Sequence, residues 1–177
     1  PGHPIAGRES SGVEASSADL FDGRNVIITP GDQSSFRHIE RVTRLWESVG
    51  AQVLSMSAAD HDRILAWTSH LPHAVAFALV NAMANHAESE VLFDLAAGGF
   101  YDFTRISSSD PVMWRDVSLT NKAALLEAIS GYKAALDELA KLISSGDSAG
   151  IEQYFRQSRD ARNLGLKQKS LEQKSRK

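Results

Sequence analysis

The stretch Ser69-His70-Leu71-Pro72-His73 places a serine and two histidines around a proline, inside a mostly apolar run from Ile64 to Val80. A buried helix normally excludes such groups, because an unpaired buried imidazole or hydroxyl costs about 1–3 kcal/mol. Pro72 also removes one backbone donor and clashes with the preceding turn, so the pattern predicts a helix that kinks or restarts here. Taken alone, the stretch fits either a broken core helix or a functional site.

The residues around this stretch predict a mainly helical chain. A helix that opens at Asp60-His61-Asp62 should continue through the break to about Asn85, and its second part, Ala74–Ala84, is apolar nearly all round. A helix that is apolar on every side is buried, either centrally or between subunits. Caps, glycines and apolar spacings predict further helices over residues 90–97, 112–117, 122–143 and 149–164, with a short turn over 100–106.

The first 57 residues have a different pattern. They begin with a loop rich in proline and glycine, with one short helix predicted near residues 13–21. Two β-branched runs, 24–30 and 51–56, flank an amphipathic segment over 36–49, which predicts a small parallel strand–helix–strand unit. We therefore predict three parts: a loop with a small α/β segment (1–57), a helical domain (58–164) and a polar, disordered tail (165–177).

The composition is that of an ordinary globular domain, with 177 residues of which 42% are hydrophobic and 23% charged. A formal net charge of -3 gives no indication of a nucleic-acid or membrane partner, and no apolar run approaches the roughly 18 residues of a membrane span. The chain has no cysteine, which excludes disulfides and is compatible with a cytoplasmic location. Its opening residues are not a signal peptide and suggest a domain of a longer protein.

Common nucleotide and metal motifs are missing from the sequence. Neither a GxGxxG nor a P-loop pattern occurs, and Gly98-Gly99 by itself is typical of a helix terminator. His70 and His73 are three residues apart, as two ligands on one helical face would be. No carboxylate stands at a familiar spacing to complete that site, and Pro72 spoils its geometry, so we expect no metal.

Four blocks of sequence, taken in order, carry a resemblance to a known family. They are His3-Pro4-Ile5-Ala6-Gly7 with Glu9, Ser11 and Gly12; Asp60-His61-Asp62; Ser69-His70-Leu71-Pro72-His73; and Gly98–Ile106 followed by Asp110–Trp114. In this order they resemble the prephenate/arogenate dehydrogenases of tyrosine biosynthesis, over residues 1 to about 164. The match is to the family's carboxy-terminal helical domain and the loop before it, and the family's Rossmann domain is expected to be absent from this chain.

The resemblance implies a fold and an assembly. The fold would be mainly α, a helical dimerisation domain like the carboxy-terminal domain of 6-phosphogluconate dehydrogenase, with a small α/β segment in front. The assembly would be a homodimer formed through the apolar helices. The sequence of Ala74–Ala84 is consistent with this, because obligate homodimer interfaces resemble a core cut in half.

The resemblance also implies a reaction, the oxidative decarboxylation of prephenate to 4-hydroxyphenylpyruvate, or of arogenate, with hydride transfer to NAD or NADP. A base is needed near the ring hydroxyl, and a neutral imidazole suits that task at neutral pH. The family's catalytic histidine matches His3, which could otherwise be a loop histidine held by Pro4. Without the nucleotide-binding domain, the chain is expected to bind substrate weakly if at all and not to turn over.

Other positions of the family's motif also match residues of this chain. Arg105 matches the substrate-binding arginine, whose planar guanidinium can bind a carboxylate through two hydrogen bonds. The remaining positions implied at the substrate pocket are Ser69, His73, Gly98 and Trp114. Those implied in ion pairs that gate the pocket are Glu9 and Asp102. Each has an ordinary structural alternative: a surface charge, a helix cap or a core aromatic.

Three departures from the family's pattern bear on the substrate. Arg8 replaces a small hydroxyl residue, Ala97 a third glycine, and Tyr101 a basic residue, and the choice between prephenate and arogenate stays open. Binding of tyrosine as a feedback ligand is a further implication of the resemblance.

Two other functions also stay open. One is a regulatory or dimerisation module without catalysis, which the intact His3, Ser69, His73 and Arg105 argue against. The other is a 3-hydroxy acid dehydrogenase of the same two-domain plan. Such enzymes usually depend on a lysine in the helical domain, and nothing around the nearest candidate, Lys122, resembles that site.

Overall fold

The fold is mainly α with one small sheet, as the sequence predicts. It is known from a computed structural model that describes residues 1–7 and 12–174. Its internal contacts divide the chain into two compact units, Pro1–Ala128 and Ile129–Lys177. The helix α7 (Lys122–Ser144) contains the point of division. Of the residues described, none belongs to a helix both long and apolar enough to cross a membrane.

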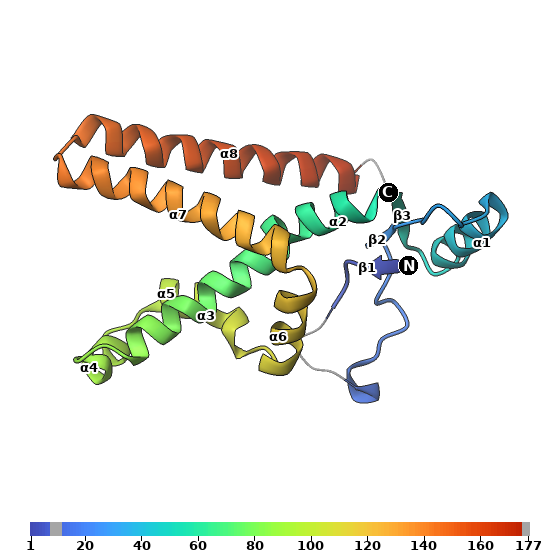
Figure 1. The fold of residues 1–177 in the computed structure, drawn as a ribbon, viewed down its shortest axis with the longest axis horizontal. Coiled ribbons are helices and arrows are strands. Elements are labelled where there is room, and N and C mark those ends of the chain that lie inside the picture. The colour runs from blue at the N-terminus through green and yellow to red at the C-terminus, as the bar shows by residue number, and fades with distance from the viewer. Residues whose placement is uncertain (8–11, 175–177) are drawn as a thin grey trace. The chain divides into compact units, whose positions relative to one another are not determined.

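A three-stranded sheet with the order β1-β2-β3 lies at the start of the first unit. β2 (Asn25–Ile28) pairs in parallel with β3 (Gln52–Ser55), and α1 (Phe36–Glu47) connects them, which confirms the predicted strand–helix–strand unit (Figure 1). β1 (Gly2–Pro4) pairs antiparallel with β2, with His3 opposite Ile27. The sequence predicts a loop for these residues, because a strand of three residues has too little alternation to be recognised and depends on a distant partner.

The stretch 69–73 does not break its helix. α2 (Ala58–Leu65) continues into a π-helical turn, η2 (Ala66–His70), and then into α3 (Leu71–Ala84), and Figure 1 shows α2 and α3 in one line. Pro72 lies in the first turn of α3, a position at which a helix tolerates proline. The wider π turn therefore takes up the disturbance that the sequence predicted as a kink or restart.

Short helices complete the first unit: η1 (Val13–Ala15), α4 (Ser89–Asp94), α5 (Gly98–Thr104), η3 (Arg105–Ser108) and α6 (Pro111–Thr120). Asp110 caps α6 as its position before Pro111 predicts, because its Oδ1 accepts from Val112 N at 2.7 Å. Two predictions are wrong in detail. The helix expected near 13–21 is only the single turn η1, and Gly98 begins a helix instead of terminating one.

The second unit pairs most of α7 with α8 (Ser148–Lys174). Figure 1 shows the two helices side by side, and Tyr154 Oη donates to Ala135 O at 3.1 Å. The turn between them contains Gly146 at φ +66°, a conformation that favours glycine. The predicted disordered tail is helical through Lys174, because lysine, glutamine, leucine and glutamate are good helix formers even without an apolar face to bury.

The chain alone does not bury the apolar helix α3. Only Leu71 and Ala76 of its residues are buried, and Leu79 is 38% exposed. The largest contiguous set of buried side chains in the sheet is Val26, Ile27 and Ile28 of β2. Of the two predicted alternatives for Ala74–Ala84, the single chain does not show central burial, and burial between subunits stays a prediction.

Candidate functional site

A row of polar contacts joins β1 to α2. His3 Nδ1 lies 2.8 Å from His61 Nε2, and His61 Nδ1 lies 2.8 Å from Asp62 Oδ1. The side chain of His61 is 19% exposed, whereas that of Asp62 is 52% exposed. Strand pairing holds His3 at this place, because β1 is the strand next to β2, and α2 presents His61 to it.

Two histidines of this region, His3 and His70, have a pKa below the ordinary value and so favour their neutral form. Partial burial lowers the pKa of His3, and the charge of a protonated His61 lowers it further. Burial also lowers the pKa of His70, with His61, His3 and His73 acting in the same direction and Asp62 opposing them. An imidazole of this kind is ready to accept a proton at neutral pH.

Asn121, at the end of α6, forms hydrogen bonds with Asp62 of α2, 59 residues away, and with His70 of the π turn. It is only 8% exposed, and its Nδ2 donates to the backbone carbonyl of Asp62 at 2.8 Å. The same nitrogen lies 3.1 Å from His70 Nδ1. Because an amide nitrogen is only a donor, His70 Nδ1 is the acceptor, and a neutral His70 carries its proton on Nε2.

A cavity of about 470 Å³ lies beside His3. It is lined by His3, Pro4, Ile5, Ala6, Gly7, Arg24, Leu65, Thr68 and Ser69. The lining comes from the segment after β1 and from the junction of α2 with the π turn, so the wide turn places Ser69 on the same cavity as His3. The volume is within the range of pockets that hold small ligands.

A second cavity, of about 460 Å³, adjoins the first, because Gly7 lines both. The rest of its lining is His73, Arg105, Ile106, Ser108, Ser109, Met113 and Trp114. The imidazole of His73 stacks on the indole of Trp114, with ring centroids 3.6 Å apart and planes at 21°. This second cavity therefore combines a guanidinium with an aromatic wall.

The hydrogen bond of His73 determines what it offers a ligand. His73 Nδ1 lies 2.9 Å from the backbone carbonyl of Ser69, which can only accept. Nδ1 must then carry the proton, and Nε2 of the neutral ring is an acceptor. In this geometry His73 is a donor to a ligand only when its ring is protonated.

The structure brings some of the predicted site residues together and not others. His3 and Ser69 share the first cavity, and His73, Arg105 and Trp114 share the second. Gly98 and Asp102 are exposed on α5 and line neither of these two cavities. Glu9 and Arg8 lie outside the described residues.

Four residues of this site were not predicted from the sequence to be functional: His61, Asp62, His70 and Asn121. The first three belong to blocks that carry the resemblance, and their density of imidazoles and carboxylates was the signal that could have marked them. Asn121 had no such signal, because its contacts with His70 and Asp62 arise only from the folding of α6 against α2.

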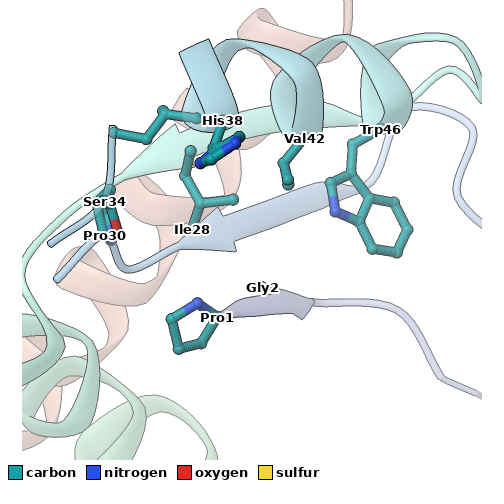
Figure 2. A pocket seen from close by; sticks show the side chains of 9 residues that line it. Pro1, Gly2, Ile28, Pro30, Ser34, His38, Val42 and Trp46 are labelled. Atoms are coloured by element: carbon teal, nitrogen blue, oxygen red, sulfur yellow. The ribbon is translucent and has the colours of Figure 1, made fainter. Parts of the chain in front are cut away.

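A third cavity, of about 310 Å³, lies between α1 and the sheet. Figure 2 shows its lining, with the side chains of His38, Val42 and Trp46 on one side and Pro1 on the other. None of the predicted site residues that the structure describes lines it. In the described part of the chain, no group of three or more histidine and carboxylate side chains could hold a metal ion.

Comparison with known proteins gives two family matches. Residues 57–157 match the model described as prephenate dehydrogenase, dimerization domain, and residues 1–55 match the model described as prephenate dehydrogenase, nucleotide-binding domain. The nucleotide-binding domain was expected to be entirely absent from this chain, and that expectation is wrong, because residues 1–55 match its model. The glycine-rich turn is the distinctive sequence feature of such a domain, and a strand–helix–strand unit without that turn cannot be identified from sequence.

Several relatives cover nearly all of this chain. The cyclohexadienyl dehydrogenase of Zymomonas mobilis is 37% identical over 169 residues, which are 94% of this chain and 57% of the relative. The structure of Aquifex aeolicus prephenate dehydrogenase with hydroxyphenyl propionate and NAD+ is 43% identical with a TM-score of 0.88, and the match covers 92% of this chain and 57% of that one. Synechocystis arogenate dehydrogenase is 28% identical with a TM-score of 0.83, and the match covers 92% of this chain and 60% of that one.

The chain spans about half the length of the curated relatives it matches. The dimerization-domain model alone matches more than half of its 177 residues. The mainly α fold, the order of the four sequence blocks and this match agree. The chain belongs to the prephenate dehydrogenase family.

Proposed function

We propose that the whole protein catalyses the NAD(P)-dependent oxidative decarboxylation of prephenate or arogenate, and that this chain supplies the base and the substrate pocket. One observation carries the proposal: of two cavities that share Gly7, one is lined by an imidazole of lowered pKa, His3, and the other by a guanidinium, Arg105. The substrate needs a base at its ring hydroxyl and a cation at a carboxylate. Together, the two cavities offer both groups.

His3 acts as the base in this proposal. Its Nδ1 is occupied by His61, so Nε2 is the ring nitrogen that is left for the substrate. The C4 hydroxyl gives its proton to Nε2 as the C4 hydride departs, the ring carboxylate leaves as carbon dioxide, and the electrons of that broken bond complete the aromatic ring. The lowered pKa keeps His3 unprotonated before the step.

The second cavity holds and orients the substrate. Arg105 binds a carboxylate through two hydrogen bonds, and Trp114 with the stacked His73 forms a flat wall for the ring. Ser69 lines the first cavity together with His3 and contributes a hydroxyl there. Gly98 and Asp102, which lie in neither of these cavities, stay predictions from the resemblance, as does the gating role of Glu9.

The fit of this chain to a nicotinamide cofactor is partial. Residues 1–55 contribute a parallel strand–helix–strand unit of the nucleotide-binding domain, and the sequence contains no GxGxxG turn. We therefore assign phosphate binding to no residue of this chain. When bound, the cofactor supplies an acceptor for the hydride.

Both substrates remain in the proposal. The Aquifex aeolicus prephenate dehydrogenase was solved with hydroxyphenyl propionate and NAD+, and the Synechocystis protein is an arogenate dehydrogenase. This chain is similar to both relatives, so the likeness supports either substrate. Feedback binding of tyrosine and a cytoplasmic location stay predictions.

We also propose that the protein is a homodimer through α3. Support comes from the matched model, which describes a dimerization domain, and from α3 itself, which is apolar nearly all round yet has only two buried residues in the single chain. A second copy would cover the apolar surface that this chain leaves exposed.

The proposed function is tested by cofactor reduction with the chain extended upstream to include the rest of its nucleotide-binding domain. Prephenate and arogenate are each offered with NAD and NADP, beside a His3→Asn variant and a Val13→Ala control that lies on neither cavity. We expect turnover with at least one substrate, and its loss in His3→Asn while the substrate still binds. A folded protein without turnover for any pair would refute the proposal.

A further inference from the structure

The hydrogen bonds between β1 and α2 have one direction when both imidazoles are neutral. A carboxylate can only accept, so the 2.8 Å contact requires His61 Nδ1 to carry a proton and donate it to Asp62 Oδ1. His61 Nε2 is then an acceptor, and the 2.8 Å contact with His3 Nδ1 requires His3 to be the donor. The proton of His3 is thereby placed on Nδ1, and the lone pair on Nε2.

This direction matters because of what a free imidazole prefers. In water, the neutral ring of histidine favours the tautomer with its proton on Nε2. In that tautomer, His3 would present an N–H to the cavity it lines and could not accept a proton there. An acceptor at Nε2 therefore needs a partner that keeps the proton on Nδ1.

The elements around the pair hold it in place. The side chain of His61, on α2, is 19% exposed and contacts His3 of β1. Asp62 is anchored through its backbone carbonyl by the buried Asn121, at 2.8 Å. The neighbouring carboxylate of Asp60 has other partners: it accepts hydrogen bonds from Arg63 Nη2 at 2.9 Å and from Ser57 Oγ at 2.8 Å.

We propose that His61 and Asp62 are positioning residues that hold His3 in the tautomer with its lone pair on Nε2. In a catalytic triad, a carboxylate bonds directly to the imidazole base and fixes its tautomer. Here the carboxylate of Asp62 acts on His3 through a second imidazole, that of His61. The inference rests on the proposed function for its importance in catalysis. The tautomer itself is a property of this chain and is measurable without substrate or cofactor.

The direct test reads the tautomer of His3 by long-range 15N–1H correlation spectra of the labelled chain. The pH is set about two units above the ordinary histidine pKa of roughly 6.5, so that neutral rings dominate. A His3→Gln variant assigns the signals. We expect the proton of His3 on Nδ1 in the unchanged chain and on Nε2 in Asp62→Ala. Without the carboxylate, His61 reverts to its own preferred tautomer and becomes the donor to His3 Nδ1.

Two further variants make the result decisive. Asp60→Ala removes the neighbouring carboxylate, which accepts from Ser57 and Arg63, and should leave the tautomer of His3 unchanged. His61→Phe keeps a ring of similar size without nitrogens, and should also release His3 to the Nε2–H form. If Asp62→Ala does not fold, His61→Phe decides alone. The Nε2–H form of His3 in the unchanged chain, or a proton that stays on Nδ1 in the folded variant, would overturn the inference.

An activity measurement on the upstream-extended protein separates this inference from the proposed function. We expect Asp62→Ala to lower kcat about 10- to 1,000-fold while KM changes little, below the roughly 10⁴-fold loss seen when a triad loses the correct tautomer. Asp60→Ala should retain kcat. Turnover with no change of tautomer in Asp62→Ala refutes the inference and leaves the function standing. A change of tautomer in a protein that never turns over refutes the function alone.

Discussion

At the scale of single residues, the arrangement of Trp114 and His73 shows how little freedom the candidate pocket has. The two rings stack at 3.6 Å, and the buried Nε1 of Trp114 has no hydrogen-bond partner among the described residues. His73 is in turn held by the carbonyl of Ser69. The two rings are thus already stacked as a wall without a ligand, and preorganisation of this kind lowers the entropy lost on binding.

Arg105 should control substrate affinity more than the chemical step. In the upstream-extended protein, we expect Arg105→Leu to raise KM about 10- to 100-fold, because a hydrogen bond to a charged group contributes about 1.5–3 kcal/mol. Arg115→Leu is the matched control, since Arg115 is an exposed arginine paired with Asp116 on α6. Steady-state kinetics measure both. An equal rise of KM in the two variants would contradict the assigned role of Arg105.

The lowered pKa values of His3 and His70 should make the stability of the chain depend on pH. In the unfolded chain both groups bind protons near their ordinary pKa of about 6.5, and in the folded chain they bind them only at lower pH. The unfolded state therefore holds more protons in this window, so the free energy of unfolding falls as pH falls below about 6.5. It levels off once the pH is below both folded pKa values.

Urea unfolding at a series of pH values measures this dependence. Replacing either histidine by glutamine should reduce the slope, whereas His38→Gln, on α1, is the control. A stability that rises on acidification from pH 7 to 5.5, or a slope that both variants leave unchanged, would contradict the prediction.

At the scale of elements, the π turn places the site. The π turn lies between α2 and α3, and with it Ser69 lines the first cavity and His73 the second. A regular α-helix would be expected to kink at Pro72. π turns inside α-helices are frequent at functional sites, because the extra residue re-aims side chains. Here the turn contains Ser69 and His70, the first two residues of a block that carries the family resemblance.

Asn121 should stabilise the contact between α6 and α2. We expect Asn121→Ala to lower the free energy of unfolding by about 1–3 kcal/mol, because it leaves the partly buried His70 Nδ1 without its donor and removes a bond to the Asp62 carbonyl. Asn85→Ala is the control, since Asn85 is exposed and bonds only within its own helix end, and should change the value by about 0.5 kcal/mol or less. Denaturant titration compares them, and equal losses would contradict the contact.

At the scale of the whole molecule, exposed apolar side chains are consistent with the proposed dimer. Large apolar side chains are exposed on elements of both units, among them Leu79, Leu95, Leu126 and Phe155. Monomeric proteins rarely leave that much apolar surface to water. The family match assigns residues 57–157 to a dimerization domain, and these four side chains fall within that range.

A charge on α3 should prevent the proposed dimer. Leu79 is 38% exposed in the single chain, so Leu79→Glu should fold as a monomer, whereas the unchanged chain should have the mass of a dimer. Val13→Glu is the control, because Val13 is 86% exposed and lies outside the dimerization-domain match. Light scattering after size exclusion gives the mass. A monomeric unchanged chain, or a Leu79→Glu variant that stays dimeric, would contradict dimerisation through α3.

The local elements of this protein were determined by the sequence itself. Apolar spacing, caps and β-branched runs located the strand–helix–strand unit, the helix that begins at Pro111 and both long helices, because each depends on neighbours within a few residues. The order of the four sequence blocks identified the family, and three of them already contained His3, His73 and Arg105. The helical end of α8 was missed because burial, not intrinsic propensity, was taken as the criterion.

The site depended on contacts between residues far apart in the chain. Only the tertiary structure pairs β1 with β2, places His61 at 2.8 Å from His3 across 58 residues, and brings Asn121 to Asp62. No local pattern predicts such contacts, because they follow from the packing of whole elements and not from the periodicity within one. The sequence thus determined which residues are present and in which local elements, and the tertiary structure decided which of them share a cavity and how their protons are arranged.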